Sequence, residues 1–174
     1  MRIYTLVLAN LFFSAGLVLS DLSTAYAQMC HADASPTTPV RRFVDMGNGT
    51  LVDQNTGLMW KKCLEGQMGL KCFGTAMALP WELAQQQASS INGQRFAGFS
   101  DWRLPNRQEL LSIVERQCEN PSANLQIFPH TPAAGLWSAD EAGLNAWTLD
   151  FTHGKEYRSF KGGGKYVRLV RRLR

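Results

Sequence analysis

The stretch SDWRLPNRQELLSIV, residues 100–114, joins a turn-rich segment to a short amphipathic helix in the middle of the chain. Asn106 can cap this helix, and Glu109 stands three residues later, as a capping box requires. We expect the helix to end near Arg116 or Gln117, before Cys118. Helical spacing predicts a buried face made of Leu110, Ile113 and Val114.

The first half of this stretch allows two interpretations. In a sugar site, Trp102 would stack on a pyranose ring while Asp101 and Arg103 bond its hydroxyls. In a structural role, Trp102 fills the core and Arg103 makes a fork-shaped bond to a carboxylate or to backbone carbonyls. We favour the structural role. The same role is expected for the other tryptophans, which lie on apolar stripes or strands: Trp60, Trp81, Trp137 and Trp147.

A first helix is predicted upstream, in PWELAQQQASSI at 80–91. Pro80 suits the first turn of a helix. One apolar stripe at helical spacing contains Trp81, Ala84, Ala88 and Ile91. We therefore expect two helices in this part of the chain.

Residues 45–60, DMGNGTLVDQNTGLMW, place oxygen-bearing side chains among glycines. A calcium loop of the EF-hand type needs a Glu at its twelfth position, but counting from Asp45 that position holds Thr56. Asn48-Gly49 is a strong signal for a tight turn between two strands. The sequence therefore predicts a hairpin and no cofactor. A nonstandard calcium site is the alternative, with Asp45, Asn48 and Asp53 as its ligands.

The last third of the chain is predicted to be β. Alternation in AWTLDF, residues 146–151, puts Trp147, Leu149 and Phe151 on one face of a strand. GLWSAD, EYRSF and YVRLVRRL are the other expected strands. A strand pair, two helices and then several strands form an α+β order, with both helices packed on antiparallel strands.

The four cysteines predict two disulfides, because an even number in an exported chain usually pairs. Three pairings are possible. We prefer Cys63–Cys72, which closes a short loop, together with Cys30–Cys118, which ties the amino-terminal segment to the body. Zinc is the rival interpretation. It is disfavoured because the chain has no CxxC, and its three histidines lack ligand spacing.

The amino terminus predicts export. Residues 1–27 combine Arg2, an apolar run and the small residues AYA at 25–27, the order of a secretory signal peptide. A transmembrane anchor is less favoured because the apolar run is short and ends in a processing site, and no later stretch is long enough to span a bilayer. Residues 28–40 are predicted to be an extended segment and 41–174 one domain. Periplasm, cell surface and extracellular space are all compatible.

The carboxy-terminal region is strongly basic, although the whole chain carries a net charge of only +4. A cluster of this kind can hold a polyanion through several salt-screened contacts. The alternative is a solvated face with an arginine or two paired internally. No base-reading motif accompanies the charge, so nucleic acid is not a predicted partner. The candidate ligand-binding residues are Lys155, Arg158, Lys161, Lys165, Arg168, Arg171 and Arg172.

Catalysis has little support in the sequence. A nucleophile needs a base within reach, and no histidine is evidently close to Ser100 or Ser138. Cysteines that are paired in disulfides cannot act as thiolates. We therefore predict a protein that is not an enzyme.

Several motifs in one order carry a resemblance to a known family. They are GNGTLVDQNTGLMW, SDWRLPNRQELLSIV, FPHTP, LWSAD, AWTLDF followed by x-x-G, and the terminal YVRLVR. Together, over roughly 41–172, they resemble the bacterial secreted-domain family once labelled DUF1566, now named after the carboxy-terminal domain of the Legionella collagen-like adhesin. The resemblance implies a compact C-type-lectin-like domain and an adhesive role. The named adhesin binds sulfated glycosaminoglycans but has a collagen-like stalk, and this chain has no Gly-X-Y repeat.

Three functional hypotheses follow. The first is an exported, lectin-like module that binds anionic glycans or other surface polymers through the basic carboxy-terminal hairpin. The second is an assembly component of an envelope or pilus-like apparatus that binds a protein partner. The third is a hydrolase of envelope polysaccharide. Salt separates the first two, because polyanion binding weakens steeply with ionic strength and an apolar interface does not.

Overall fold

The computed structural model describes residues 27–173. The predicted signal peptide, apart from its last residue, lies outside the described residues. Among the residues that are described, no helix has the length and apolar character needed to cross a membrane.

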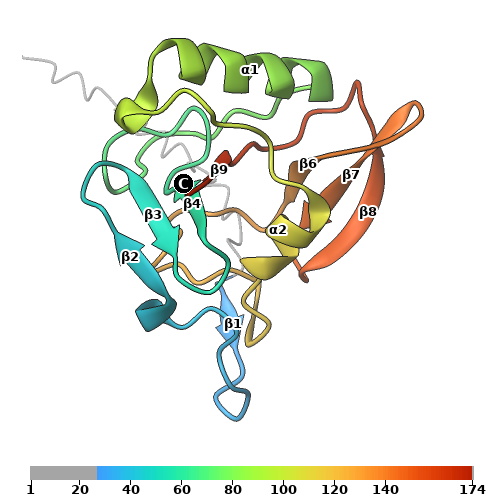
Figure 1. Cartoon of the computed structure of the whole chain (residues 1–174). Helices are drawn as coiled ribbons and strands as arrows, with labels where there is room; N and C mark the ends of the chain where they lie inside the picture. Colours follow the sequence, from blue (N-terminus) through green and yellow to red (C-terminus); the bar gives the residue numbers. More distant parts are fainter. Residues whose placement is uncertain (1–26, 174) are drawn as a thin grey trace, which may run out of the picture.

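Most of the regular structure is antiparallel β, arranged in three sheets (Figure 1). The four-stranded sheet has the order β2-β3-β4-β9, so the last strand of the chain pairs with β4. The three-stranded sheet is the meander β6-β7-β8, and a two-stranded ribbon joins β1 to β5. The strands are β1 Met29–Cys30, β2 Phe43–Asp45, β3 Thr50–Asp53, β4 Leu58–Lys61, β5 Cys118–Glu119, β6 Gly135–Ala142, β7 Asn145–Asp150, β8 Lys155–Phe160 and β9 Val170–Arg172.

The predicted two-helix, C-type-lectin-like α+β fold is wrong. Within residues 27–173, only α1, Trp81–Gly93, is a helix of ordinary length, and α2 is confined to Arg107–Ser112. Two short 3₁₀ turns complete the set of helices in the described part of the chain, η1 at Val40–Arg42 and η2 at Phe96–Gly98. The molecule is therefore a mostly β domain with one substantial helix, which lies along one side of it (Figure 1).

Helix α2 begins as predicted and ends early. The Asn106 side chain accepts from the Glu109 N–H, and the Glu109 carboxylate accepts from the Asn106 N–H, so the capping box is formed. Just after the helix, the Glu115 carboxylate binds backbone N–H groups of a distant segment, and Cys118 enters β5. These tertiary bonds pull the chain out of the helical path before residue 116.

Two hydrophobic cores hold the sheets together. One contains Trp60 and the buried side of α2; the other contains Trp102, Trp137 and the buried stripe of α1. All four residues predicted for the α1 stripe are buried. Trp60, Trp102 and Trp137 have exposed fractions of 0–2 %. Trp147 is in neither core, and its side chain lies on the half-exposed surface of β7.

Residues 45–60 form the predicted hairpin, but its turn is longer than an Asn-Gly pair. β2 and β3 are joined by residues 46–49, and positive φ angles fall on Gly47 and Gly49. The candidate calcium ligands bind protein donors: Asp45 accepts from Gly47 N and Lys62 Nζ, and the Asn48 amide oxygen accepts from Thr50.

Asp53, the third candidate, is wholly buried and forms a two-pronged ion pair with Arg42. Burial alone would raise the pKa of its carboxyl. The bonds from Arg42 and Thr56 outweigh burial and hold that pKa below its usual value. Within residues 27–173, no group of three or more His, Cys, Asp or Glu side chains is arranged to hold a metal ion.

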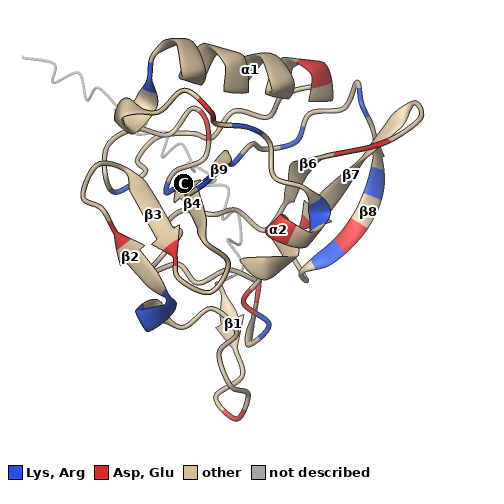
Figure 2. Cartoon of the chain, viewed as in Figure 1, with Lys and Arg blue, Asp and Glu red and all other residues tan. Residues whose placement is uncertain are grey.

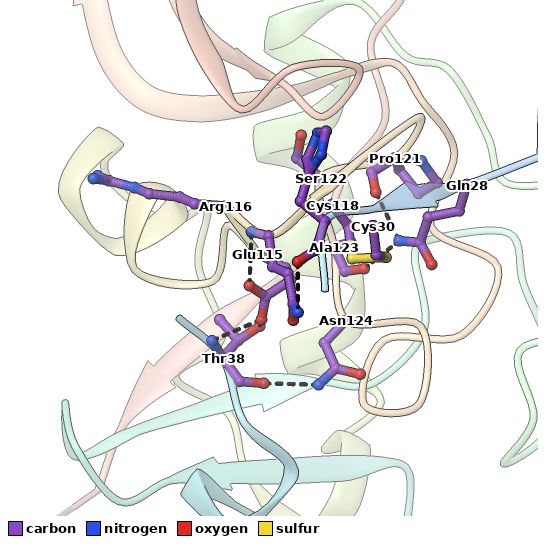
Figure 3. Close-up of a disulfide and its surroundings, with 12 residues drawn as sticks. Gln28, Cys30, Thr38, Glu115, Arg116, Cys118, Pro121, Ser122, Ala123 and Asn124 are labelled. Atoms are coloured by element: carbon purple, nitrogen blue, oxygen red, sulfur yellow. Dashed lines mark hydrogen bonds between the residues drawn. A yellow bond between two sulfur atoms is a disulfide. The ribbon is translucent and has the colours of Figure 1, made fainter. Parts of the chain in front are cut away.

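Both preferred disulfides are present, Cys30–Cys118 and Cys63–Cys72. The first lies in the β1–β5 ribbon and ties the amino-terminal segment to the body (Figure 3). The Glu115 carboxylate accepts from the backbone N–H groups of Thr37 and Thr38 on that same segment. Burial opposes ionisation of Glu115, but these bonds prevail and lower its pKa. The predicted extended segment is thus fastened by one covalent bond and a set of polar ones.

Candidate functional site

The structure does not gather the seven basic candidates into one surface patch. Arg168 is wholly buried: its guanidinium donates to the carbonyls of Lys61 and Lys62 and to Thr131 Oγ1, and it lies 4.6 Å from the Phe128 ring centroid. Burial lowers the pKa of Arg168 to about 9, although the nearby Glu65 raises it, so the guanidinium is still charged at neutral pH. Arg168 is placed to hold β4 and the 131 region together, out of reach of a surface ligand.

Arg171 and Lys161 also have internal partners. Arg171 is only 5 % exposed, bonds both carboxylate oxygens of Asp101 and lies 3.8 Å from the Phe99 ring centroid. The Lys161 ammonium is 2.7 Å from Glu141 Oε2 and lies over the Trp81 ring. Arg168 and Arg171 therefore match the alternative given above, in which one or two of the arginines are paired inside the protein.

The remaining candidates are scattered. The half-buried Lys165 lies against Gly135 and bridges Leu79 through its backbone. Arg172 is exposed and lines an open cleft of about 560 Å³ beside α2. Lys155 is exposed at the start of β8, in a shallow hollow that Arg116 and His153 also line. Arg158 is the candidate that adjoins an aromatic side chain of the three-stranded sheet.

That aromatic side chain is Trp147. The Arg107 guanidinium carbon lies 4.1 Å from the Trp147 ring centroid, and that of Arg158 lies 4.9 Å from it. We call this surface, made of Arg107, Trp147 and Arg158, the Trp147 face. Trp147 and Arg158 are cross-strand partners in β7 and β8. Basic positions at the start of α2 and along β8 lie near this corner of the molecule (Figure 2).

Local structure positions each member of the Trp147 face. Arg107 is the first residue of α2, and its backbone N–H donates to Asp140 Oδ2 on β6, which locks the helix start against the sheet. Arg107 Nε lies 3.7 Å from Glu156 Oε1, a loose ion pair. Within the described residues the Arg158 guanidinium makes no hydrogen bond or ion pair. Its N–H groups are therefore available to an incoming acceptor.

This arrangement suits anion recognition. Stacking on an indole restrains a guanidinium while leaving its edge exposed. A guanidinium edge offers paired donors that match the oxygens of a sulfate, carboxylate or phosphate. Two such groups around one ring can bind neighbouring anionic groups of a polymer.

The distinctive SDWRLP segment has the structural role. Trp102 is buried, and its indole Nε1 donates to the Phe96 carbonyl. Arg103 forms a bidentate pair with Glu109, with both N···O distances at 2.7 Å. Burial opposes ionisation of Glu109, but Arg103 and the capping bond lower its pKa. Asp101 is the partner of Arg171.

Sequence reasoning missed Arg107 and placed Trp147 with the structural tryptophans. Arg107 stands far from Trp147 in the sequence, inside a motif whose other residues are structural. Alternation identified the correct face of β7 for Trp147. Trp147 lies outside both hydrophobic cores although it is on the central strand of the sheet, and how far the cores extend along β7 is a tertiary property that alternation does not contain.

Fold and surface define a class: a small, disulfide-linked, mostly antiparallel β domain that presents stacked arginines. Within that class the chain matches the Lcl C-terminal domain over residues 49–171, which is more than half of its length, and it belongs to that family. Membership suggests an adhesin-associated envelope module, and membership together with two disulfides is consistent with an exported protein. No curated protein sequence matches the chain.

Proposed function

We propose that this protein is an exported, non-catalytic module of the cell envelope or its surroundings that binds acidic glycans through the Trp147 face. The observation that carries the proposal is the pair of guanidiniums stacked around Trp147, with the Arg158 guanidinium unbonded among the described residues. The site is smaller than the basic carboxy-terminal hairpin and only partly coincides with it.

The chemistry of the face favours an acidic polymer over a neutral sugar. Neutral pyranoses usually stack on an open aromatic ring, whereas here guanidiniums lie over the indole. Guanidinium edges instead suit sulfate or carboxylate groups. Because Arg158 is exposed and Arg107 and Trp147 are partly exposed, contacts with a ligand are reached by solvent, so each is weak and screened by salt. A repeating ligand that makes several such contacts in a row is the best match.

The test is retention of the oxidised protein on a heparin column developed with a salt gradient. The variant Arg107→Gln/Arg158→Gln removes two positive charges from the Trp147 face. The control Arg41→Gln/Lys71→Gln removes two from other exposed positions, whose side chains make no hydrogen bond or ion pair within residues 27–173. We expect the first variant to elute at clearly lower salt than the control, since local geometry as well as net charge is lost.

Equal elution of the two variants would reject the Trp147 face as the site. Retention that does not change with salt would contradict an ionic mechanism and favour a protein partner in the envelope. A panel of sulfated, carboxylated and neutral glycans then defines the ligand class. Binding confined to neutral glycans would reject the proposal.

A further inference from the structure

Strand β8 has an open edge. The sheet order is β6-β7-β8, so β8 pairs with β7 on one side and with no other strand of the described chain on its other side. The strand lies at the outer boundary of the molecule (Figure 1). An open edge presents unpaired N–H and C=O groups that a further strand can use.

The register identifies which backbone groups face outward. Lys161 N donates to Leu144 O, and the Thr148 hydroxyl donates to the Tyr157 carbonyl. In an antiparallel pair the hydrogen-bonded residues alternate along the strand. Residues 155, 157, 159 and 161 therefore direct their backbone groups toward β7. Glu156 and Arg158 direct theirs toward the open edge.

The side chains at this edge are self-complementary. Consider two copies of β8 placed antiparallel with Tyr157 on the two-fold axis. Glu156 of one copy then lies opposite Arg158 of the other, and the same pair recurs on the other side of the axis. Shifting the centre to Glu156 or to Arg158 sets like charges opposite one another, which is unfavourable. One register alone combines outward backbone groups with opposite charges.

Two further observations fit a second strand at this position. Neither oxygen of Glu156 has a hydrogen bond within the described chain, and its nearest cation is Arg107 Nε at 3.7 Å. Large apolar side chains are exposed along the edge and at its end, namely Tyr157 at 48 %, Phe160 at 65 % and Leu144 at 81 %. A paired strand from a second copy would give the Glu156 carboxylate a donor, and it would cover part of this apolar surface.

We propose that two copies of this protein associate by antiparallel pairing of their β8 edges, centred on Tyr157, to form a continuous six-stranded sheet. A two-fold axis normal to the sheet keeps both Trp147 faces on the same side. A single strand pair buries less surface than a stable obligate dimer does, so the association is a concentration-dependent equilibrium. If the proposed function holds, one polymer chain can span both faces and bind with added avidity.

The first experiment is a charge swap followed by analytical ultracentrifugation of the oxidised protein over a wide concentration range. Arg158→Glu sets Glu opposite Glu, and Glu156→Arg sets Arg opposite Arg, so each variant should be monomeric. The double variant Glu156→Arg/Arg158→Glu restores two opposite-charge pairs and should dimerise as the unaltered protein does. Arg158 is exposed and Glu156 is partly buried, so circular dichroism is used to verify that each variant is folded.

A wholly monomeric unaltered protein, or a double variant that stays monomeric while folded, would overturn the proposal. Dimerisation that persists in both single variants would show association through another surface and would overturn it too.

The second experiment is independent of binding strength. In the proposed register Tyr157 faces its own copy at a non-hydrogen-bonded position, where Cα atoms are about 4.5 Å apart, within the range for a disulfide. Tyr157→Cys should therefore form a covalent dimer under mild oxidation. Lys155→Cys is the matched control, because its two copies would lie roughly four residues apart along the paired strands, about 13 Å. Equal cross-linking of the two variants would reject the register, whereas selective cross-linking at 157 supports it.

Discussion

Arg168 and Arg158 belong to the same basic third of the sequence, yet the fold gives them opposite environments. Arg168 is wholly buried and donates to two carbonyls and a hydroxyl, while the Arg158 guanidinium rests on an indole at the surface and makes no hydrogen bond in the described chain. A buried guanidinium whose partners are protein acceptors stabilises the fold. An exposed one held by stacking is available to a ligand. A count of basic residues cannot separate these two roles.

The largest loss of stability is expected when the buried Arg168 is replaced. Arg168→Met leaves the carbonyls of Lys61 and Lys62 and the Thr131 hydroxyl without their donor. We expect the free energy of unfolding to fall by about 3 kcal/mol, as measured by urea denaturation. Arg168→Lys keeps the charge but lacks the planar, multiple-donor geometry of the guanidinium, so its unfolding free energy should lie between those of Arg168→Met and the unaltered protein. A loss below about 0.5 kcal/mol for both variants would contradict the structural role.

Arg171 provides a smaller effect of the same kind. Arg171→Met breaks the bond to Asp101, whose side chain is 36 % exposed, but keeps apolar contact with Phe99. Because one partner is partly solvated, we expect a loss of about 1–2 kcal/mol in urea denaturation. The contrary outcome is a stability equal to that of the unaltered protein accompanied by weaker heparin retention, which would move Arg171 into the ligand-binding class.

Arg103 is an intermediate case, with a half-exposed side chain paired to the nearly buried Glu109. The pKa of Glu109 is lowered in the folded state, so its contribution to stability is present above its ordinary value of 4.5 and is lost as pH falls through the lower folded pKa. Glu109→Gln removes this titration. The free energy of unfolding of this variant, measured by denaturation at each pH, should fall less than that of the unaltered protein on acidification below about pH 4.5. If the unfolding free energies of the two proteins fall in parallel with pH, the Arg103–Glu109 pair contributes nothing measurable to the pH dependence of stability.

Arg158 should show the reverse pattern. Arg158→Gln removes no internal hydrogen bond, so unfolding should change by less than about 0.5 kcal/mol, while heparin retention falls. Arg168→Lys, at a temperature where it is folded, should keep its heparin retention. The comparison fails if the two variants lose retention equally.

Arg172 should give the smallest effect. It is exposed beside α2, and it acts on Glu109 only as a distant charge. Arg172→Gln should leave stability unchanged within error and should lower heparin elution no more than any single charge removal does. A marked loss of retention would extend the binding surface to the cleft beside α2.

Local signals predicted several parts of the fold correctly. The capping box at Asn106 and the four-residue stripe of α1 are properties of neighbours along one helix, and both are present. The hairpin at 45–60 follows from turn chemistry, although the turn is longer than expected. The prediction of a two-helix fold was wrong because α2 is cut short by the bonds of Glu115 to Thr37 and Thr38, which come from a segment far away in the chain.

The sequence by itself indicated the family and the approximate positions of most elements, and it favoured the cysteine pairing and the structural role of Trp102 that the structure shows. These features depend on residue types and on their spacing along one segment, and both can be read directly from the sequence. Only the tertiary structure decided which arginines are buried, that Arg107 meets Trp147, and that β8 lies at an open edge. Each of these depends on which distant segments pack together, because burial and partners, rather than residue type, set whether a charge stabilises the fold or faces a ligand.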